Sequence, residues 1–326
     1  MAPLSKALVL APSILFQDGQ DFYGQADKEW GVITATKQNN TYGGYLLALI
    51  LEACIQFQSS TTHTDPIHLT AHFLRKTLAG PVTVRINRVK AGLALTNITA
   101  ELLQNEQIRV SAHAVFAFNG PKSNDSIAPT LNPPSSWARR HPLYVHPSQA
   151  KRKAFPPSWS FARHIGWTED EHIIAKNSVD HPNRTNSATV GGGGLEWGGW
   201  FEFKKDHITN PALAFLVDIF VNTPALLPSA SRHESTSPTW FATVALSVEF
   251  KNRIPSPSPQ HVGAERTVGI YSSGRFITSP QGRHDISVEI WTSPSNIGEG
   301  EPTDSWRENQ LCLAIAVDMQ ICHSYY

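Results

Sequence analysis

The fold is decided by residues 41–57, TYGGYLLALILEACIQF. The segment opens with turn residues and two glycines, and an apolar run then starts at Tyr45 with Glu52 as its one charged residue. This run is long for a strand and apolar on nearly every side, which indicates a helix buried in a core rather than one lying on a surface. We expect Asn40 or Thr41 to cap its first turn.

Four strand-like segments follow this helix and predict an antiparallel sheet. Apolar and polar residues alternate in each, so that one face of the sheet is buried and the other is polar. Gly80-Pro81 and Ala91-Gly92 stand where turns are needed. The segments are HLTAHFLRKT (68–77), PVTVRINRV (81–89), LALTNITAELLQN (93–105) and IRVSAHAVFAFN (108–119).

The second half of the chain repeats this order. NPALAFLVDIFVNTPALL (210–227) predicts a second buried helix, with Pro211 in its first turn and Pro224 near its end. One strand precedes it and four follow: EWGGWFEFKK (196–205), WFATVALSVEFKNRI (240–254), RTVGIYSSGRFI (266–277), HDISVEIWT (284–292) and LCLAIAVDMQI (311–321). An apolar helix followed by four strands therefore occurs twice, which indicates an internal duplication.

A connection rich in Pro and Ser separates the two halves. Proline cannot donate to a sheet ladder, so we expect residues 119–159 to lie outside the core. We assign the first repeat to 1–120, the connection to 121–190 and the second repeat to 191–326. The predicted class is α+β, in which each repeat wraps a sheet around its helix and the two sheets pair strand to strand, which removes one edge from each.

Composition narrows the function classes. Lys plus Arg and Asp plus Glu each number 27, and a net charge of zero gives no indication of nucleic acid or an anionic membrane as partner. Three cysteines, Cys54, Cys312 and Cys322, are too few for a disulfide framework and fit a reducing compartment. No apolar run reaches the roughly 18 residues that span a bilayer. Because Pro12 interrupts the N-terminal apolar stretch, we do not read it as a signal peptide, and we expect a cytoplasmic protein.

These strings resemble the acyl-CoA thioesterase II family, whose members carry two hotdog repeats, and within it the fungal thioesterase-like branch. The Gly-Gly opening of the first helix, and Phe73, Arg75 and Pro81 after it, resemble the first repeat. NPALAFLVDIFVNTPALL and WFATVALSVEF resemble the helix and strand of the second. The resemblance covers roughly residues 20–118 and 196–322. It implies a double hotdog that hydrolyses acyl thioesters, as acyl-CoA or carrier-bound acyl groups, with no metal or organic cofactor.

The family resemblance also implies a set of site residues. Members use an Asp, a Thr and a Gln to hold and activate water beside the thioester. The Asp falls on Asp218 and the Thr on Thr243. The Gln belongs in the last strand, where the best register places it on Asp318. Gln320 lies two residues further on the same strand face, and a register shift of two would restore the Gln.

The residues themselves support a site around Asp218. A carboxylate in an apolar helix is costly to bury, and an apolar setting raises its pKa toward the value that suits a general base. If Asp318 shares its pocket, repulsion splits the two titrations and leaves one acid and one base. We expect Tyr42, Gly43 and Gly44 to bind substrate, the glycines through backbone N–H groups.

Three functions remain open at this point. The first is thioester hydrolysis by Asp218 with Thr243. The second is a natural-product tailoring enzyme, an isomerase, cyclase or lyase, that uses Asp218 and Asp318 as an acid/base pair. The third is a non-catalytic acyl-binding module. The expected partner is a small acyl thioester or a hydrophobic natural product, and the expected assembly is a monomeric pseudo-dimer or a homo-oligomer. An enclosed aromatic pocket would favour a compact substrate, with candidate walls Trp197, Trp200, Trp240 and Phe241.

Overall fold

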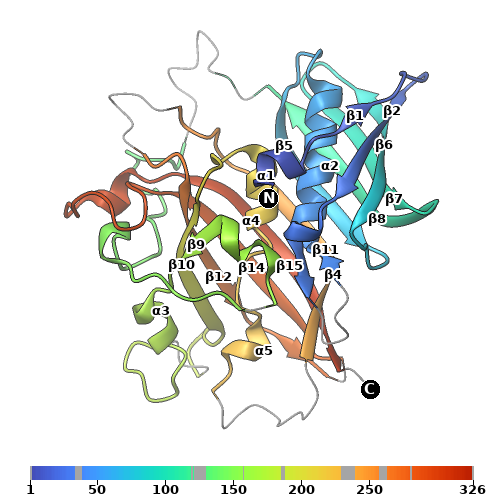
Figure 1. Cartoon of the computed structure of the whole chain (residues 1–326). Helices are drawn as coiled ribbons and strands as arrows, with labels where there is room; N and C mark the ends of the chain where they lie inside the picture. Colours follow the sequence, from blue (N-terminus) through green and yellow to red (C-terminus); the bar gives the residue numbers. More distant parts are fainter. Residues whose placement is uncertain are drawn as a thin grey trace.

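One continuous antiparallel sheet of 13 strands forms both halves of the protein (Figure 1). Each half holds one apolar helix, α2 (Gly43–Gln58) or α4 (Asn210–Leu216), and the two helices pack against each other. This is the α+β double hotdog that the sequence predicts. The computed structural model describes residues 2–33, 39–118, 120, 130–156, 158–184, 188–228, 239–256, 263–279 and 281–324.

The order of the strands displays the duplication directly. The two halves meet at β5 and β11, and moving outward from this junction each half has the same succession of strands. The first half runs β5 (Asp65–Phe73), β8 (Gln107–Ala117), β7 (Thr96–Gln104), β6 (Gly80–Ala91), β2 (Gly19–Ala26) and β1 (Ala11–Pro12). The second runs β11 (Thr239–Phe250), β15 (Cys312–Ser324), β14 (Arg283–Thr292), β12 (Thr267–Gly274), β10 (Leu195–Phe203) and β9 (Ile165–Trp167).

The remaining elements are short. β13 (Ile277–Thr278) pairs with β14, and β3 (Gly31–Ile33) pairs with β4 (Asn39–Thr41) in a separate two-stranded sheet. The short helices are α1 (Leu4–Ala7), α3 (Glu171–Ala175) and α5 (Thr223–Leu226). In the described part of the chain, no helix combines the length and apolar character that crossing a membrane requires.

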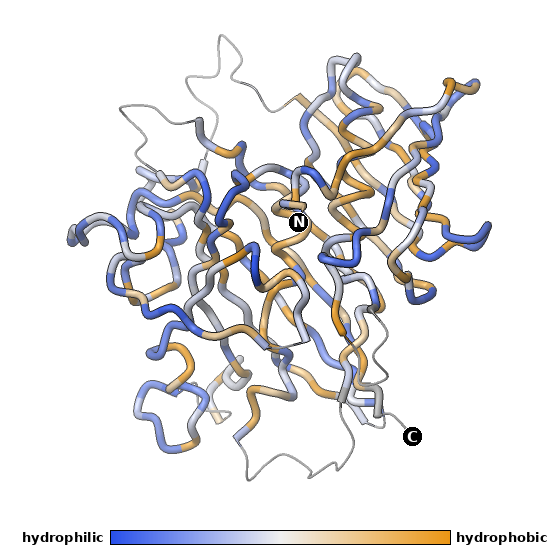
Figure 2. The backbone as a smooth tube through the Cα atoms, in the orientation of Figure 1, coloured by the Kyte–Doolittle hydropathy of each residue, from blue (hydrophilic) through white to orange (hydrophobic). Residues whose placement is uncertain are grey.

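Helix α2 forms where the apolar run predicts it. Its residues from Tyr45 to Leu51 are all buried, and in Figure 2 the helix is largely coloured as hydrophobic. The expected cap is wrong, because Asn40 and Thr41 belong to β4. The N-cap is Tyr42, which makes no capping hydrogen bond through its side chain. The first N–H groups of α2 therefore need other partners. The N–H of Gly44 finds one in the second repeat, the carboxylate of Asp218.

The second helix is shorter than predicted. Thr209 caps α4 by accepting a hydrogen bond from Ala212 N, and α4 ends at Leu216. The backbone then turns through bonds of the three-residue type, such as Ile219 N to Leu216 O. The carbonyl oxygen of Asp218 accepts a short hydrogen bond from the Tyr42 hydroxyl instead of continuing a helix. Asp218 therefore lies just beyond the helix and not in its middle.

The strands of the first repeat begin earlier than the sequence indicated. β2 occupies the position in the first half that β10 occupies in the second, and it pairs with β6 from Gly19 to Ala26. Its burial does not follow a two-residue period, because buried and exposed positions are irregularly spaced along it. The alternation that identifies the other strands is therefore missing, and β2 was not predicted.

The Pro-rich connection contributes to packing, contrary to our expectation. Leu143 and His141 are buried, and Leu143 belongs to a small apolar cluster with Trp200 and Trp306 on the second repeat. The connection also supplies β9, which extends the sheet beside β10. The reason is that the second repeat carries large aromatic side chains, such as Trp200 and Trp306, which the connection removes from water.

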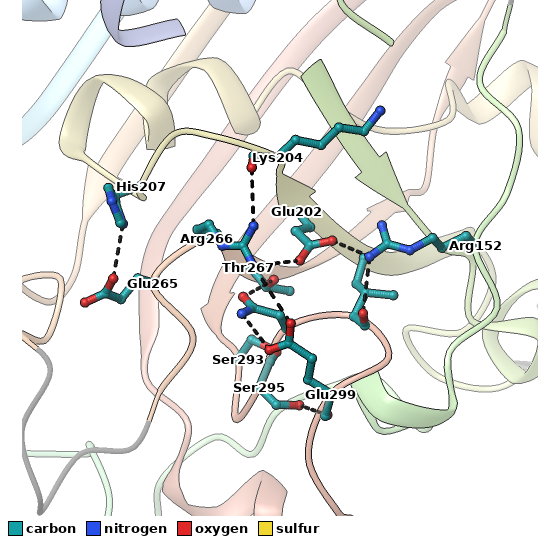
Figure 3. A network of polar contacts seen from close by, with 12 residues as sticks. Arg152, Glu202, Lys204, His207, Glu265, Arg266, Thr267, Ser293, Ser295 and Glu299 are labelled. Atoms are coloured by element: carbon teal, nitrogen blue, oxygen red, sulfur yellow. Dashed lines mark hydrogen bonds and ion pairs between the residues drawn. The ribbon is translucent and has the colours of Figure 1, made fainter. Parts of the chain in front are cut away.

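Ion pairs attach the connection to the second repeat (Figure 3). The Glu202 carboxylate of β10, which is buried, binds Arg152 of the connection on one side. On the other side it lies 3.6 Å from Arg266 Nη2. Arg152 also donates to the carbonyl oxygen of Ile297 at 3.2 Å. A buried carboxylate is tolerated here because two guanidinium groups offset its charge.

Candidate active site

Four elements bring polar groups together around Asp218. Its Oδ2 atom accepts a hydrogen bond of 2.7 Å from the backbone N–H of Gly44, in the first turn of α2. Its Oδ1 atom accepts one of 3.3 Å from the Thr243 hydroxyl on β11. Thr243 in turn lies 3.2 Å from Gln320 Nε2 on β15. Asp218 is 4% exposed, so these bonds form in a nearly dry environment.

The two glycines allow α2 to approach the chain that carries Asp218. A Cβ atom on Gly44 would lie 2.5 Å from the Phe215 carbonyl oxygen and 2.8 Å from Asp218 Cβ. A Cβ atom on Gly43 would lie 2.9 Å from Asp218 Oδ2. Any larger residue would therefore separate the helix from the carboxylate. The Gly-Gly pair is needed for this close packing, and Gly43 also lines the pocket described next.

The site opens into a pocket of about 500 Å³. Its lining is more apolar than polar, and Arg75 and Lys76 are among the lining residues. Of the aromatic residues considered from the sequence, Trp240 and Phe241 line the pocket, whereas Trp197 and Trp200 are buried elsewhere. The apolar lining includes Val32, Tyr42, Leu46, Phe73, Phe220 and Ile321. A pocket of this size and character suits a mainly apolar small molecule.

The last strand places Gln320 and Asp318 differently. Gln320 lines the pocket and stands opposite Thr243 in the β11–β15 register, next to an irregularity between Thr243 and Ala245. Asp318, which was predicted as a site residue, is fully buried and does not line the pocket. Its Oδ2 accepts a hydrogen bond of 2.8 Å from Gln320 Nε2, so it lies behind the amide.

Burial dominates the electrostatics of the site. It raises the pKa of Asp218 to about 7, although the hydrogen bonds from Gly44 and Thr243 act in the opposite direction. Burial, and next the charge of Asp218, raise the pKa of Asp318 well above its usual range. At neutral pH we therefore expect Asp318 to hold a proton while Asp218 titrates.

Two predicted substrate-binding residues have structural contacts of their own. The Tyr42 hydroxyl donates to the Asp218 carbonyl oxygen, and the Gly44 N–H donates to the Asp218 carboxylate. Both residues line or adjoin the pocket, but these groups hold Asp218 in place. The sequence offered no signal for either bond, because their partners lie more than 170 residues away along the chain.

Among the described residues, the first repeat shows no equivalent set of groups. In the corresponding strand pair, β5 and β8, the register irregularity lies after Pro66, and the residue opposite Pro66 is Phe116. Glu52 on α2 accepts a hydrogen bond from Gln56 of the same helix. Among the described residues, no group of three or more His, Cys, Asp or Glu side chains is placed to hold a metal ion. In the part of the chain that the structure describes, these polar groups therefore gather at one of the two repeats, around Asp218.

Family models match both halves of the chain. The model of the acyl-CoA thioesterase N-terminal domain matches residues 33–117, and that of the C-terminal domain matches residues 147–297. Together they cover well over half of the sequence. The chain belongs to the acyl-CoA thioesterase family. This membership makes it a thioesterase-type enzyme, in agreement with the resemblance noted in the sequence.

Solved structures with the same fold cover nearly the whole of this thioesterase family member. A putative thioesterase II from Thermobifida fusca YX superimposes with a TM-score of 0.65 at 15% identity, over 99% of this chain and 98% of that one. An acyl-CoA thioesterase II from Mycobacterium marinum gives 0.62 at 13% identity, over 99% and 98%. A hot dog protein of unknown function from Alicyclobacillus acidocaldarius gives 0.63 at 16%, with the same coverage. They confirm the double hotdog fold.

One curated relative matches part of the chain. It is the Ustilagic acid biosynthesis cluster protein orf2 of Mycosarcoma maydis, which is 28% identical over 126 residues. The match covers 33% of this chain and 31% of that protein, so the two share about a third of their lengths.

Proposed function

We propose that this protein hydrolyses an acyl thioester, with Asp218 as the general base. The observation that carries this proposal is the position of Asp218, a buried carboxylate with a pKa of about 7 beside a mainly apolar pocket. A base whose pKa lies near the working pH is the most effective one, since it is available and still takes a proton readily. The Thr243 hydroxyl donates to Asp218 and accepts from Gln320, so it is a polar group fixed beside the base, where it can orient water.

The reaction needs water and side chains alone. Asp218 removes a proton from a water held by Thr243, and the water oxygen attacks the thioester carbonyl carbon. The negative charge that develops on the carbonyl oxygen is stabilised by the N–H of Gly43 at the start of α2. The C–S bond then breaks, and the proton held by Asp218 passes to the departing sulfur. The products are a carboxylic acid and a thiol.

The pocket supports an acyl group attached to a phosphorylated carrier. Phe220, Trp240 and Phe241 offer apolar surface to the acyl group, while Arg75 and Lys76 place positive charge among the lining residues. Coenzyme A and carrier-bound pantetheine both present phosphate, which such side chains attract. We assign the acyl part to the aromatic walls and the phosphate to the basic residues.

The direct test is thiol release from acyl-CoAs of varied chain length. We expect release that requires no added metal and is greatest for acyl groups that the 500 Å³ pocket accommodates. Folded protein that releases thiol from none of them, and from no carrier-bound acyl group, would contradict the proposal.

We predict a dependence of hydrolysis on the protonation of Asp218. Because the carboxylate must be ionised to act as base, kcat/KM should fall tenfold per pH unit below about pH 7 and level off above it. A pH profile from 5 to 9, measured with one acyl-CoA, tests this. A plateau that extends below pH 5 would mean that an ordinary carboxylate, or no carboxylate, acts as base.

A second candidate is a tailoring reaction, such as isomerisation, cyclisation or elimination. Two observations favour it: Asp318 lies behind the site as a second buried carboxyl group, and the partial relative comes from a biosynthesis cluster. This candidate requires both carboxyl groups to exchange protons with the substrate. The position of Asp318 outside the pocket wall makes hydrolysis the better supported function.

A further inference from the structure

Asp318 is a buried carboxyl group that the proposed reaction does not use. Its side chain is fully buried. In the strand register it stands opposite Leu246 of β11 and Ile286 of β14, which are both buried apolar residues. Burying a carboxyl group among such neighbours costs folding free energy unless its polar atoms are used. Among the described side chains, its hydrogen-bond partner is Gln320, whose Nε2 donates to Asp318 Oδ2.

The hydrogen bonds around Gln320 run in one direction. Gln320 Nε2 donates to Asp318 Oδ2 at 2.8 Å and to Thr243 Oγ1 at 3.2 Å. An amide nitrogen carries two hydrogens, so these two bonds use both. The Thr243 hydroxyl gives its single hydrogen to Asp218 Oδ1 and is therefore free to accept from Gln320. Donation thus passes from Gln320 through Thr243 to Asp218.

This direction engages Gln320 through its nitrogen. Gln320 lines the pocket, but its Oε1 atom is itself buried and has no hydrogen-bond partner among the described residues. In the reversed amide orientation, Oε1 would face the hydroxyl oxygen of Thr243, whose hydrogen already serves Asp218. Thr243 therefore favours the orientation in which Nε2 faces it, and Asp318 Oδ2 accepts the second amide hydrogen.

We infer that Asp318 is a positioning residue that accepts a hydrogen bond from Gln320 Nε2 and so holds the Gln320 amide against Thr243, the residue beside the attacking water. This inference rests on the proposed hydrolysis. It assigns Asp318 no contact with the substrate and no proton transfer, which separates it from the acid/base role considered from the sequence.

The groups near Asp318 explain why the carboxyl form suits this task. The titratable side chains that face it or its amide partner are Asp218 after α4, Tyr42 at the start of α2 and His284 of β14, which pairs with Gln320. Burial lowers the pKa of His284, so none of these is a cation at neutral pH. A neutral carboxylic acid still offers a carbonyl oxygen as acceptor. An asparagine at this position would offer the same.

Four variants test the inference by thiol release: Asp318→Asn, Asp318→Leu, Gln320→Ala and the double variant Asp318→Leu/Gln320→Ala. Asp318→Asn should keep kcat/KM within about fivefold of wild type and keep the apparent pKa near 7, because the acceptor remains. Asp318→Leu should lower kcat by roughly 10- to 100-fold with little change in KM. The double variant should be no slower than Gln320→Ala, because Asp318 acts through the amide.

Two outcomes of these assays would overturn the inference. If Asp318→Asn is as slow as Asp318→Leu, the proton of Asp318 is needed and its role is acid/base chemistry. If the losses of Asp318→Leu and Gln320→Ala multiply in the double variant, Asp318 does not act through Gln320. The melting temperature of each variant confirms that it is folded.

A spectroscopic measurement separates this inference from the hydrolysis proposal. Side-chain amide NMR signals of Gln320, assigned by their loss in Gln320→Ala, should be two separate and exchange-protected resonances in wild type. They should lose protection in Asp318→Leu and keep it in Asp318→Asn. If the wild-type protein releases no thiol, the hydrolysis proposal alone is refuted. If the Gln320 amide resonances of Asp318→Leu are the same as those of wild type, the positioning role is refuted.

Discussion

Asp218→Asn should lower kcat/KM for thioester hydrolysis by roughly 10²–10⁴-fold, the usual contribution of a general base. The amide keeps the shape of the side chain and can still accept a hydrogen bond from the Gly44 N–H. It cannot accept a proton from water. Thiol release by the purified variant, compared with wild type at one pH above 8, measures the loss where wild-type Asp218 is fully ionised.

The same variant should be at least as stable as wild type, and more so at high pH. The pKa of Asp218 is raised on folding, from an ordinary carboxyl value to about 7. The native state then binds a proton that the unfolded state has released, so wild-type stability falls as pH rises from about 4 through 7. Asparagine removes this loss. The melting temperature of Asp218→Asn should therefore exceed that of wild type by more at pH 8 than at pH 5.

Asp170→Asn provides a matched control. Asp170 is also buried, and it accepts backbone hydrogen bonds from Tyr144 at 2.6 Å and Val145 at 3.0 Å, far from the pocket. This change should lower the melting temperature and leave kcat unchanged. If Asp218→Asn shows that pattern instead, Asp218 is a structural anchor and the proposed base is lost.

Gly44→Ala should impair both stability and turnover. The new methyl carbon would meet the Phe215 carbonyl oxygen at 2.5 Å and Asp218 Cβ at 2.8 Å, and the first of these atoms is backbone and cannot rotate away. Overpacking of this kind costs about 1–3 kcal/mol or more. Because the same methyl group displaces Asp218, we expect kcat to fall by roughly 100-fold, the effect of moving a catalytic group by an ångström. Thermal unfolding and thiol release measure the two effects.

Gly92→Ala is the control for this change. Gly92 lies in the turn between β6 and β7, and a Cβ atom there meets nothing closer than the Leu95 carbonyl oxygen at 3.4 Å. It should alter neither the melting temperature nor turnover appreciably. If Gly44→Ala has the same melting temperature as wild type, α2 can move away from Asp218 without cost. That result would contradict the packing argument.

The sequence determined the duplicated architecture of this protein. The apolar run after Gly43-Gly44 has to be buried whatever surrounds it, and α2 forms there. Alternation with a period of two identified the paired strands from β5 to β8 and from β11 to β15, because one buried face imposes that pattern on a sheet. In β2 the buried positions are irregularly spaced, so a period of two could not identify this strand from the sequence.

The tertiary structure alone decided how the site is assembled. Asp318 and Gln320 are two residues apart on one strand face, so periodicity cannot distinguish them. The pairing of Gln320 with Thr243, beside the irregularity in β11, places the amide in the pocket wall and the carboxyl group behind it. Likewise, Tyr42 and Gly44 hold Asp218 across more than 170 residues of chain, and the close approach of α2 to the end of α4 brings them together. Such contacts depend on helix packing and strand register between the two repeats, which no local pattern in either repeat encodes.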